Sequence, residues 1–352
     1  MYTKTTKEKE VFLMERLAKT FLRFSELEAQ KSSPLYAYWS KQIAEDRVLL
    51  ELISYIPASQ PKPNLFFASV QYLANKGNHP LKAYYSNFDQ SQEYLDASFN
   101  SLKEFVGLYK NDLIACFQTK LVQTNELNRS SYLYPIFSEI AQETGKPLTL
   151  IEIGTSAGLL LNLDHYQYEI REKEQTLKFG DTDSNVVVYA ENLGKSLTKV
   201  SPFIVRDRIG IDLNIVDLNQ EEEYEWMQAL IWPEQQERKE MFRRVSQFNK
   251  NIPKTLHTGD FLEFIPTFIE NINNETQIVL FHTHVANQFN ESLKQNLLTM
   301  IETISEQYPL YHVYNNLFDA NLHVDFVSRT ITTQKKLITD YDGHGKYYRW
   351  FN

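Results

Sequence analysis

The first 145 residues follow a helical pattern of apolar side chains. From Leu13 to Leu27, apolar residues recur at steps of three and four, which is the spacing of a buried stripe along one face of an α-helix. Ser33 before Pro34 marks the start of another helix. Prolines between residues 57 and 63 interrupt the pattern, which then resumes up to Gly145 without an evident strand. The sequence therefore predicts an all-helical N-terminal domain over residues 1–145.

The pattern changes after Gly145-Lys146-Pro147. LTLIEIG is a short β-branched run that ends in glycine, and further strand-like runs follow, separated mostly by segments of helical length: 203–217, 277–285 and 309–317. Such alternation predicts a mostly parallel sheet with helices on both faces. The last stretch, 324–351, predicts an antiparallel pair at the end of the sheet. We therefore expect an α/β domain over residues 146–352.

Composition narrows the class of protein. With 42% hydrophobic and 23% charged residues the chain has the composition of a soluble globular protein. It has 36 basic and 45 acidic residues, a net charge of −9, whereas binding to a phosphate backbone needs concentrated positive charge. We therefore expect a small-molecule partner and no nucleic acid. Cys116 is the single cysteine, which excludes an internal disulfide and a cysteine zinc cluster.

Two further features bear on location. No run approaches the roughly 18 consecutive apolar residues that a membrane helix needs. The polar start, MYTKTTKEKE, is followed by no apolar segment of the signal-peptide kind. These features predict a cytoplasmic protein without a membrane partner.

The main candidate chemistry lies in LTLIEIGTSAGLLLNL, residues 148–163. Residues 154–158 match the G-x-S-x-G of a hydrolase nucleophile elbow. His344 and a later acid, Asp319 or Asp342, would complete a triad with Ser156. An α/β-hydrolase builds several strands before this serine, whereas largely helical sequence precedes Ser156. A serine hydrolase is therefore the alternative hypothesis.

The same segment also fits a nucleotide-type loop. A dinucleotide loop, G-x-G-x-x-G, would need glycine where Ser156 and Leu159 stand, so NAD and FAD are disfavoured. What remains is a strand that ends near Glu152, a glycine turn, and a following helix whose first N–H groups would meet a ligand carboxylate. Glu152 would accept a hydrogen bond from a ligand ammonium. Gly154 and Gly158 would let the backbone approach the ligand closely.

The segment resembles the first motif of the class I S-adenosylmethionine (SAM)-dependent methyltransferases, E/D-x-G-x-G-x-G, with Ser156 in place of the middle glycine. Most of the chain is also similar to a bacterial family of unknown function (DUF2332), in SPLYAYWSKQIAEDRVLL (33–50), QTNELNR (123–129), LIEIGTSAGLLLNLDHYQY (150–168), RIGIDLNIVDLN (208–219), WPEQQER (232–238) and HTGDFLEFIP (257–266). The resemblance implies a Rossmann-like methyltransferase sheet with SAM as cofactor. Its cofactor-binding residues would include Glu152, Gly154, Thr155, Ser156 and Gly158.

The resemblance also implies an acid at the end of the second strand that accepts from both ribose hydroxyls. IGIDLN places Asp212 there. In a dinucleotide fold, roughly 20 residues separate the glycine turn from this acid. The separation between Gly158 and Asp212 is larger, so we treat about 167–202 as an inserted hairpin. Asp181, Asp183 and Glu191 in this insertion remain rivals for the ribose. The alternative for Asp212 is a turn or helix-capping acid.

Two later segments supply further candidates. Gly259-Asp260-Phe261 resembles the methyltransferase segment that contacts adenine, in which Asp260 would accept from the amino group and Phe261 would cover the ring. Alternatively, Asp260 caps the next helix. His282 ends a strand-like run and is a candidate general base. Alternation places His284 on the same side, but two histidines are too few for a typical metal site, and we expect none.

QTNELNR supplies the last candidates. Asn125 can cap the following helix and Glu126 suits its first turn, which leaves Arg129 unexplained. If the helical domain covers the carboxyl edge of the sheet, Gln123, Asn125 and Arg129 would bind the carboxylate of the cofactor or the substrate. Glu126 would then be a second candidate base.

Taken together, these residues predict a SAM-dependent methyltransferase that acts on a small molecule. The acceptor would attack the methyl group in line, and catalysis would come mainly from positioning. A third hypothesis is a binding protein that keeps the fold without turnover.

Overall fold

The computed structural model describes residues 6–124, 126–272 and 275–351. The chain divides into two compact units, one formed by residues 1–124 with 219–243 and the other by residues 125–218 with 244–352. Compared with the expected division at residue 145, the first unit ends earlier and takes a second segment. The helix at 130–144 therefore belongs to the second unit. Among the described residues, no helix combines the length and the apolar character that crossing a membrane requires.

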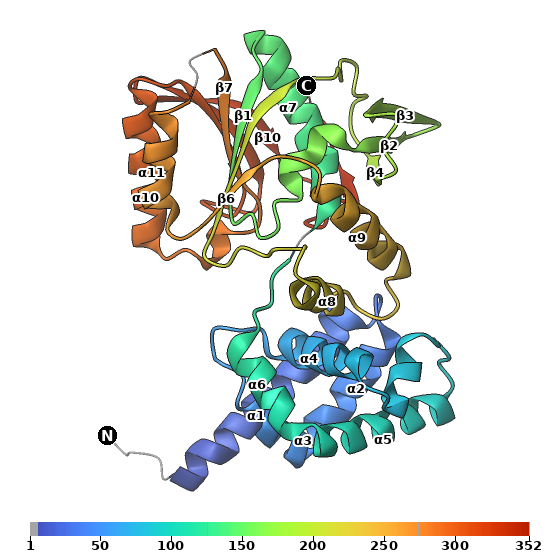
Figure 1. Ribbon diagram of the computed structural model, residues 1–352. Coiled ribbons are helices and arrows are strands. Elements are labelled where there is room, and N and C mark those ends of the chain that lie inside the picture. The colour runs from blue at the N-terminus through green and yellow to red at the C-terminus, as the bar shows by residue number, and fades with distance from the viewer. Residues whose placement is uncertain (1–5, 125, 273–274, 352) are drawn as a thin grey trace. The chain divides into compact units, whose positions relative to one another are not determined.

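The described part of the first unit consists of helices joined by turns and loops and contains no β-strand (Figure 1). Helix α2 begins as predicted, because Ser33 accepts a hydrogen bond from the Tyr36 backbone N–H and Pro34 takes the first helical position. Tyr36 stacks on Phe67 in the core with ring centroids 4.2 Å apart. The helices of this unit are α1 (Thr6–Phe24), a π-helical turn (Ser25–Ala29), α2 (Pro34–Glu45), α3 (Arg47–Ile53), α4 (Lys62–Lys76), a 3-10 turn (Pro80–Tyr85), α5 (Gln92–Leu108), α6 (Lys110–Thr119), α8 (Glu221–Ala229) and the first part of α9 (Gln236–Asn249).

The second unit is built on a seven-stranded sheet with the order β10-β9-β8-β7-β1-β5-β6. Its strands are β1 (Leu148–Ile153), β5 (Val205–Asp212), β6 (Thr255–Thr258), β7 (Gln277–His282), β8 (Leu310–Tyr314), β9 (Leu322–Ser328) and β10 (Ile331–Ile338). The five neighbouring strands β6, β5, β1, β7 and β8 pair in parallel, whereas β9 is antiparallel to both of its neighbours, β8 and β10. This confirms a mixed α/β fold with a mostly parallel sheet and an antiparallel pair at one end.

Helices cover both faces of this sheet. Figure 1 shows α10 (Phe261–Ile269) and α11 (Glu291–Ser305) together on one face and α7 (Ser130–Thr144) on the other. Ile151 and Ile153 of β1 lie in the core on the α10 and α11 side. On the opposite side, Phe137 of α7 contacts Phe281 of β7 edge to face, with centroids 5.3 Å apart. Glu152, between the two isoleucines, therefore points to the α7 side, because successive side chains in a strand alternate.

The expected insertion forms part of a separate sheet with the order β11-β4-β2-β3. Strands β2 (Gln167–Glu172) and β3 (Gln175–Gly180) pair as an antiparallel hairpin, and β4 (Val187–Asn192) runs parallel to β2. Near the other end of the chain, β11 (Tyr347–Tyr348) joins the edge of β4.

One local expectation was wrong, because no α-helix follows the glycine turn. Residues Leu160–His165 form a short 3-10 turn with a kink at Asn162, and β2 begins directly after it. The Tyr166 hydroxyl donates to the Leu159 carbonyl at 2.6 Å and the Tyr168 hydroxyl to the Leu163 carbonyl at 2.7 Å. These side-chain hydrogen bonds thus take carbonyl groups that an α-helix would use itself. The helix N-terminus that was to bind a carboxylate is absent.

Candidate functional site

The candidate site lies at the carboxyl ends of β1, β5 and β7. Strand β1 has β5 on one side and β7 on the other, so the order of the strands along the chain reverses direction at β1. In open α/β sheets, ligands bind outside the carboxyl ends of the strands at such a reversal. The turn at 154–158, Asp212 and Thr283 directly follow or end these strands.

The glycine turn has a left-handed backbone at three positions. The φ angles are +76° at Gly154, +50° at Ser156 and +69° at Gly158. A Cβ atom on Gly154 would lie 2.3 Å from Cγ2 of Val285, so this position needs glycine both for its conformation and for space. Ser156 adopts a strained left-handed conformation without being glycine, which is a feature that clusters at ligand sites.

Asp212 connects the end of β5 to this turn. Its Oδ2 accepts from the Ser156 backbone N–H at 2.8 Å, and its Oδ1 accepts from the Asn214 N–H at 3.0 Å. Of the rival acids, Glu191 lies in β4 of the second sheet, and Asp181 and Asp183 lie in the turn after β3. Asp181 accepts from the Asp183 N–H in a turn, and Glu191 forms a 2.6 Å ion pair with Arg171. Asp212 is therefore the acid that the structure places beside the glycine turn.

Glu152 is a buried acid at the end of β1. Its side chain is 4% exposed, and the Thr155 hydroxyl donates to its Oε2 at 2.6 Å. Burial, with a smaller contribution from the charge of Asp212, raises the pKa of Glu152 to about 8, although the Thr155 hydroxyl and the charge of Arg129 oppose the shift. At neutral pH this carboxyl group is therefore mostly protonated.

Arg129 joins two motifs that are remote in the sequence. Its Nε donates to the Gly343 carbonyl at 3.0 Å, and its Nη1 donates to the Thr283 carbonyl at 3.2 Å and to the Thr283 hydroxyl at 3.4 Å. Next to it, the Ser131 hydroxyl donates to the Gly345 carbonyl at 3.0 Å. The end of QTNELNR is thus fixed to the Asp342–Gly345 turn.

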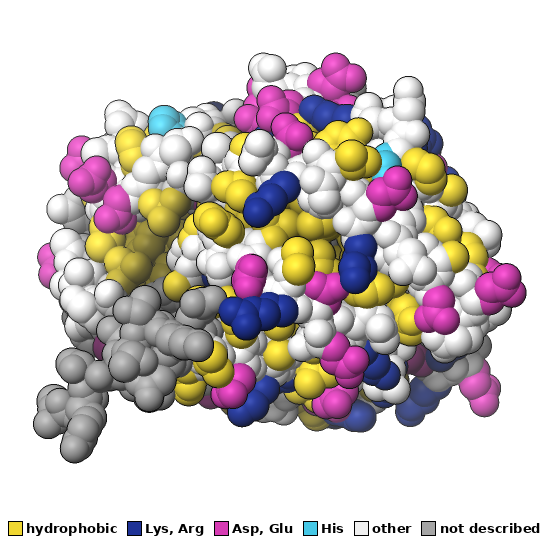
Figure 2. Space-filling view, turned by 90° about the horizontal axis from the view of Figure 1, so that it is seen from below, with side chains coloured by type: hydrophobic (Ala, Val, Ile, Leu, Met, Phe, Trp, Pro, Cys, Tyr) yellow, Lys and Arg dark blue, Asp and Glu magenta, His cyan; other side chains and the backbone are white. Residues whose placement is uncertain are grey.

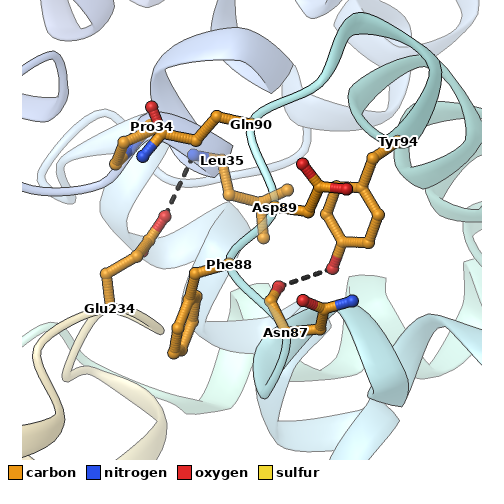
Figure 3. Close-up of a pocket in the computed structure, with 8 residues that line it drawn as sticks. All are labelled: Pro34, Leu35, Asn87, Phe88, Asp89, Gln90, Tyr94 and Glu234. Atoms are coloured by element: carbon orange, nitrogen blue, oxygen red, sulfur yellow. Dashed lines mark hydrogen bonds between the residues drawn. The ribbon is translucent and has the colours of Figure 1, made fainter.

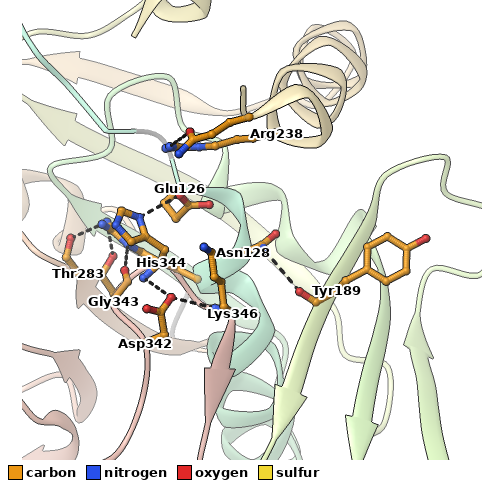
Figure 4. A network of polar contacts seen from close by, with 11 residues as sticks. Glu126, Asn128, Tyr189, Arg238, Thr283, Asp342, Gly343, His344 and Lys346 are labelled. Atoms are coloured by element: carbon orange, nitrogen blue, oxygen red, sulfur yellow. Dashed lines mark hydrogen bonds and ion pairs between the residues drawn. The ribbon is translucent and has the colours of Figure 1, made fainter. Parts of the chain in front are cut away.

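Glu126 and His344 form a polar pair beside Arg129. Nδ1 of His344 lies 3.2 Å from Oε2 of Glu126, and Figure 4 shows both with Thr283 and Gly343 nearby. The Glu126 side chain is 8% exposed, whereas that of His344 is 57% exposed. The sequence did not link these two residues, because nothing in the local pattern indicates a contact between them. Gln123 belongs to the first unit, and Asn125 lies outside the described residues.

His282 and His284 have different surroundings. His282 is fully buried with its Nε2 3.1 Å from Nε2 of His312, and burial lowers its pKa to about 3. His284 leaves the strand with a φ of +57°, and its N–H donates to Oδ1 of Asn315 at 2.7 Å. The alternation on which the expectation for the two rings rested does not extend to His284, because β7 ends at His282. Sequence reasoning also missed His312 and Asn315.

In the described part of the chain, no group of three or more His, Cys, Asp or Glu side chains is placed so that it could hold a metal ion.

Asp260 and Phe261 have structural contacts in the second unit. Oδ1 of Asp260 accepts from the Leu262 N–H at 2.9 Å and caps α10. Phe261 is 7% exposed and stacks on Phe289 with centroids 5.4 Å apart. Their contact with adenine stays a prediction.

The nucleophile elbow keeps one of its features and lacks others. Ser156 has the left-handed conformation of a sharp turn, but it is 3% exposed and no α-helix follows it. Oδ1 of Asp319, one of the two expected triad acids, lies 2.9 Å from Nε2 of His323 and so pairs with a different histidine. The carboxylate beside the imidazole of His344 is that of Glu126.

Two surface depressions lie elsewhere. One is in the helical unit (Figure 3) and is lined by Pro34, Leu35, Asn87, Phe88, Asp89, Gln90, Tyr94 and Glu234. The other, near the antiparallel edge of the main sheet, is lined by Pro309, Phe326, Ser328, Arg329, Ile331 and Thr333. Neither is lined by a residue that the sequence proposed for the site. On the face drawn in Figure 2, Lys and Arg side chains are scattered among acidic and apolar ones.

Residues 18–350 match the model of a bacterial family described as "Uncharacterized protein conserved in bacteria (DUF2332)". The chain belongs to this family. A comparison of the chain with curated proteins found no match. Membership in DUF2332 confirms the family that the sequence motifs indicated, and it leaves the reaction to be argued from the site.

Proposed function

We propose that this DUF2332 protein binds SAM and transfers its methyl group to a small molecule. The observation that carries the proposal is the pair of acids Glu152 and Asp212, which end neighbouring parallel strands on either side of the glycine turn. Across the sheet, the five parallel strands lie in the order β6, β5, β1, β7 and β8. Numbered by their order along the chain, these are the third, second, first, fourth and fifth parallel strands. That order is the one that binds nucleotide cofactors at the reversal point in Rossmann folds, and it supports a Rossmann-like methyltransferase sheet.

Each part of the cofactor has a proposed partner at this edge. Asp212 would accept from the ribose hydroxyls, and the backbone of residues 154–158 would lie along the ligand. Asp260 would accept from the adenine amino group through Oδ2, because its helix-capping bond uses Oδ1. Phe261 would border the adenine from the core side. When bound, SAM supplies an electrophilic methyl group.

The protein's own contribution to the reaction is positioning and exclusion of water. Holding an acceptor atom in line with the methyl group removes much of the entropic part of the barrier. Glu126 and His344 are the proposed proton acceptor for the substrate, since the exposed imidazole can reach solvent or substrate while the buried carboxylate orients it. His282 is left out of this role, because a base with a pKa of about 3 accepts protons poorly near neutral pH.

Calorimetric titration with S-adenosylhomocysteine tests the cofactor site. The wild-type protein should bind in the micromolar range, on the order of −8 kcal/mol. Asp212→Asn keeps an acceptor for the Ser156 N–H and loses the carboxylate, so it should bind about tenfold more weakly. The matched control is Asp183→Asn, at an exposed turn of the second sheet, which should bind like the wild type. Absence of binding to the wild type would contradict the proposal.

The other hypotheses have separate readouts. Labelling by a fluorophosphonate probe that disappears in Ser156→Ala would favour a serine hydrolase. Affinity for S-adenosylhomocysteine without methyl transfer to any acceptor would favour a binding protein.

A further inference from the structure

Strand β10 lies at the edge of the main sheet, where β9 is its one partner among the described strands. An edge strand presents a row of unpaired N–H and C=O groups, which proteins normally cover or protect with bulges and lysines. The second half of β10 is protected in this way, by a register shift after Gln334 and by Lys335 and Lys336. Residues 331–334 are exposed and carry neither device. This half of the strand can therefore accept a further strand.

The hairpin between β9 and β10 determines which backbone groups point outward. The turn at residues 329–330 has φ angles of +51° and +65°, which are typical of a two-residue type I′ turn. Such a turn is closed by a hydrogen-bonded pair, here Ser328 and Ile331, and hydrogen-bonded pairs then alternate along the ladder. The N–H and C=O groups of Thr332 and Gln334 therefore point away from β9.

An arginine stands in this turn at a position that favours other residues. Type I′ turns prefer asparagine, aspartate or glycine, because the left-handed conformation is strained for most side chains. Arg329 adopts it with its N–H donating to the Ser305 carbonyl oxygen at 2.8 Å. Its guanidinium group is exposed and forms no ion pair with the other residues that the structure describes. Strain of this kind clusters at ligand sites, and here it places a cation beside the start of β10.

An apolar depression lies next to the turn. Its volume is about 410 Å³, and it is lined by Pro309, Phe326, Ser328, Arg329, Ile331 and Thr333. The ring of Phe326 is half-buried and lies 5.0 Å from that of Tyr311, centroid to centroid. Ile331 is 67% exposed, so covering its side chain would be favourable. The depression thus adjoins both the open edge and the arginine.

We propose that this edge binds a peptide with a free C-terminus and an apolar last residue, as a strand antiparallel to β10. The terminal carboxylate would accept a charge-assisted hydrogen bond from Arg329. The last side chain would lie opposite Ile331 and fill the depression, and the preceding residues would pair with Thr332 and Gln334. The arginine stands at the start of β10, which sets the antiparallel direction. Its charge argues for a chain end, because the backbone inside a protein segment carries no charge.

The experiment uses the full chain and the pentapeptide Thr-Val-Thr-Val-Leu, labelled at its N-terminus with fluorescein, as the free acid and as the C-terminal amide. Fluorescence anisotropy should show that the wild type binds the free acid about tenfold more tightly than the amide. Arg329→Asn suits the left-handed turn and removes only the cation, so its affinity for the free acid should fall to that for the amide. Arg171→Gln, at an exposed arginine of the second sheet, should behave as the wild type.

Thr332→Pro tests strand addition, because it removes an outward N–H group and an edge strand tolerates proline at such a position. Both peptides should bind about tenfold more weakly, with urea unfolding still cooperative. In the wild type, the free acid should slow hydrogen exchange at the amides of Thr332 and Gln334, which needs no variant. Equal affinities for acid and amide, unchanged exchange at these two amides, or absence of binding to the free acid would each overturn the proposal.

Discussion

The Arg129 guanidinium donates to the Gly343 carbonyl oxygen at 3.0 Å, although the two residues lie 214 positions apart. This bond connects the segment before α7 to a turn near the end of the chain. The same turn places His344 beside Glu126. The candidate site of the second unit therefore depends on how closely the turn packs against residues 126–131.

Replacing Gly345 by alanine tests this packing. Gly345 has a φ of +77°, and a Cβ atom there would lie 2.2 Å from the Asn128 carbonyl oxygen. Gly145→Ala is the matched control, because Gly145 has a φ of +65° and a Cβ atom there would meet nothing within 4 Å. Both variants should lose roughly 1–2 kcal/mol from the left-handed backbone, and Gly345→Ala should lose clearly more. Equal losses in urea unfolding would show that the turn yields easily.

Ligand binding should release a proton from Glu152. With a pKa of about 8, about nine in ten of these carboxyl groups are protonated at pH 7. A bound ammonium favours the ionised form and lowers this pKa, so the proton leaves as S-adenosylhomocysteine binds. Calorimetry at pH 7 in phosphate and in Tris should give binding heats that differ by nearly the full difference between the ionisation enthalpies of the two buffers. The difference should vanish in Glu152→Gln, and equal heats for the wild type would rule out the linkage.

The sequence predicted some features of this site because they have local signals. Strand β1 ends in an acid and a glycine turn, and both follow from a β-branched run that stops at Gly154. The pattern of apolar residues after Gly158 predicted a helix, whereas the hydroxyls of Tyr166, which ends the 3-10 turn, and of Tyr168 in β2 bond back to the carbonyl groups of Leu159 and Leu163. The contact between Arg129 and Gly343 was likewise beyond sequence reasoning, because it depends on how distant segments fold together.

Acid should destabilise the second unit through its buried histidines. Burial lowers the pKa of His282 to about 3 and that of His312 well below its usual range. An unfolded chain binds these protons near the ordinary pKa of about 6.5, so it holds more protons than the folded chain below that pH. Stability is therefore fully present above pH 6.5 and is lost between pH 6.5 and 3, by up to about 1.4 kcal/mol per pH unit for each ring.

The measurement is the free energy of unfolding in urea at pH 7 and pH 5. His312→Phe keeps a ring beside Tyr314, which His312 stacks on at 4.2 Å, and removes one titrating group. Its loss of stability between the two pH values should be smaller than that of the wild type. A wild-type stability that is the same at both pH values would contradict this role of the histidine pair.

Glu234 should stabilise the helical unit by capping α2. Its Oε2 accepts from the Ser33 hydroxyl at 2.6 Å and its Oε1 from the Leu35 N–H at 3.0 Å, and Figure 3 shows the second of these bonds. Glu234→Ala should cost about 1–3 kcal/mol. Glu104→Ala, on an exposed position of α5, should be close to neutral. Tryptophan fluorescence during unfolding suits this comparison, because Trp39, Trp226 and Trp232 lie in this unit.

The most direct measurement is a crystal structure of the protein with S-adenosylhomocysteine. Our account predicts density for the ligand across the carboxyl ends of β1 and β5, with the ribose on Asp212, the ammonium on Glu152 and the carboxylate on Arg129. Density at another place on the protein, or none at a saturating concentration of the ligand, would contradict it.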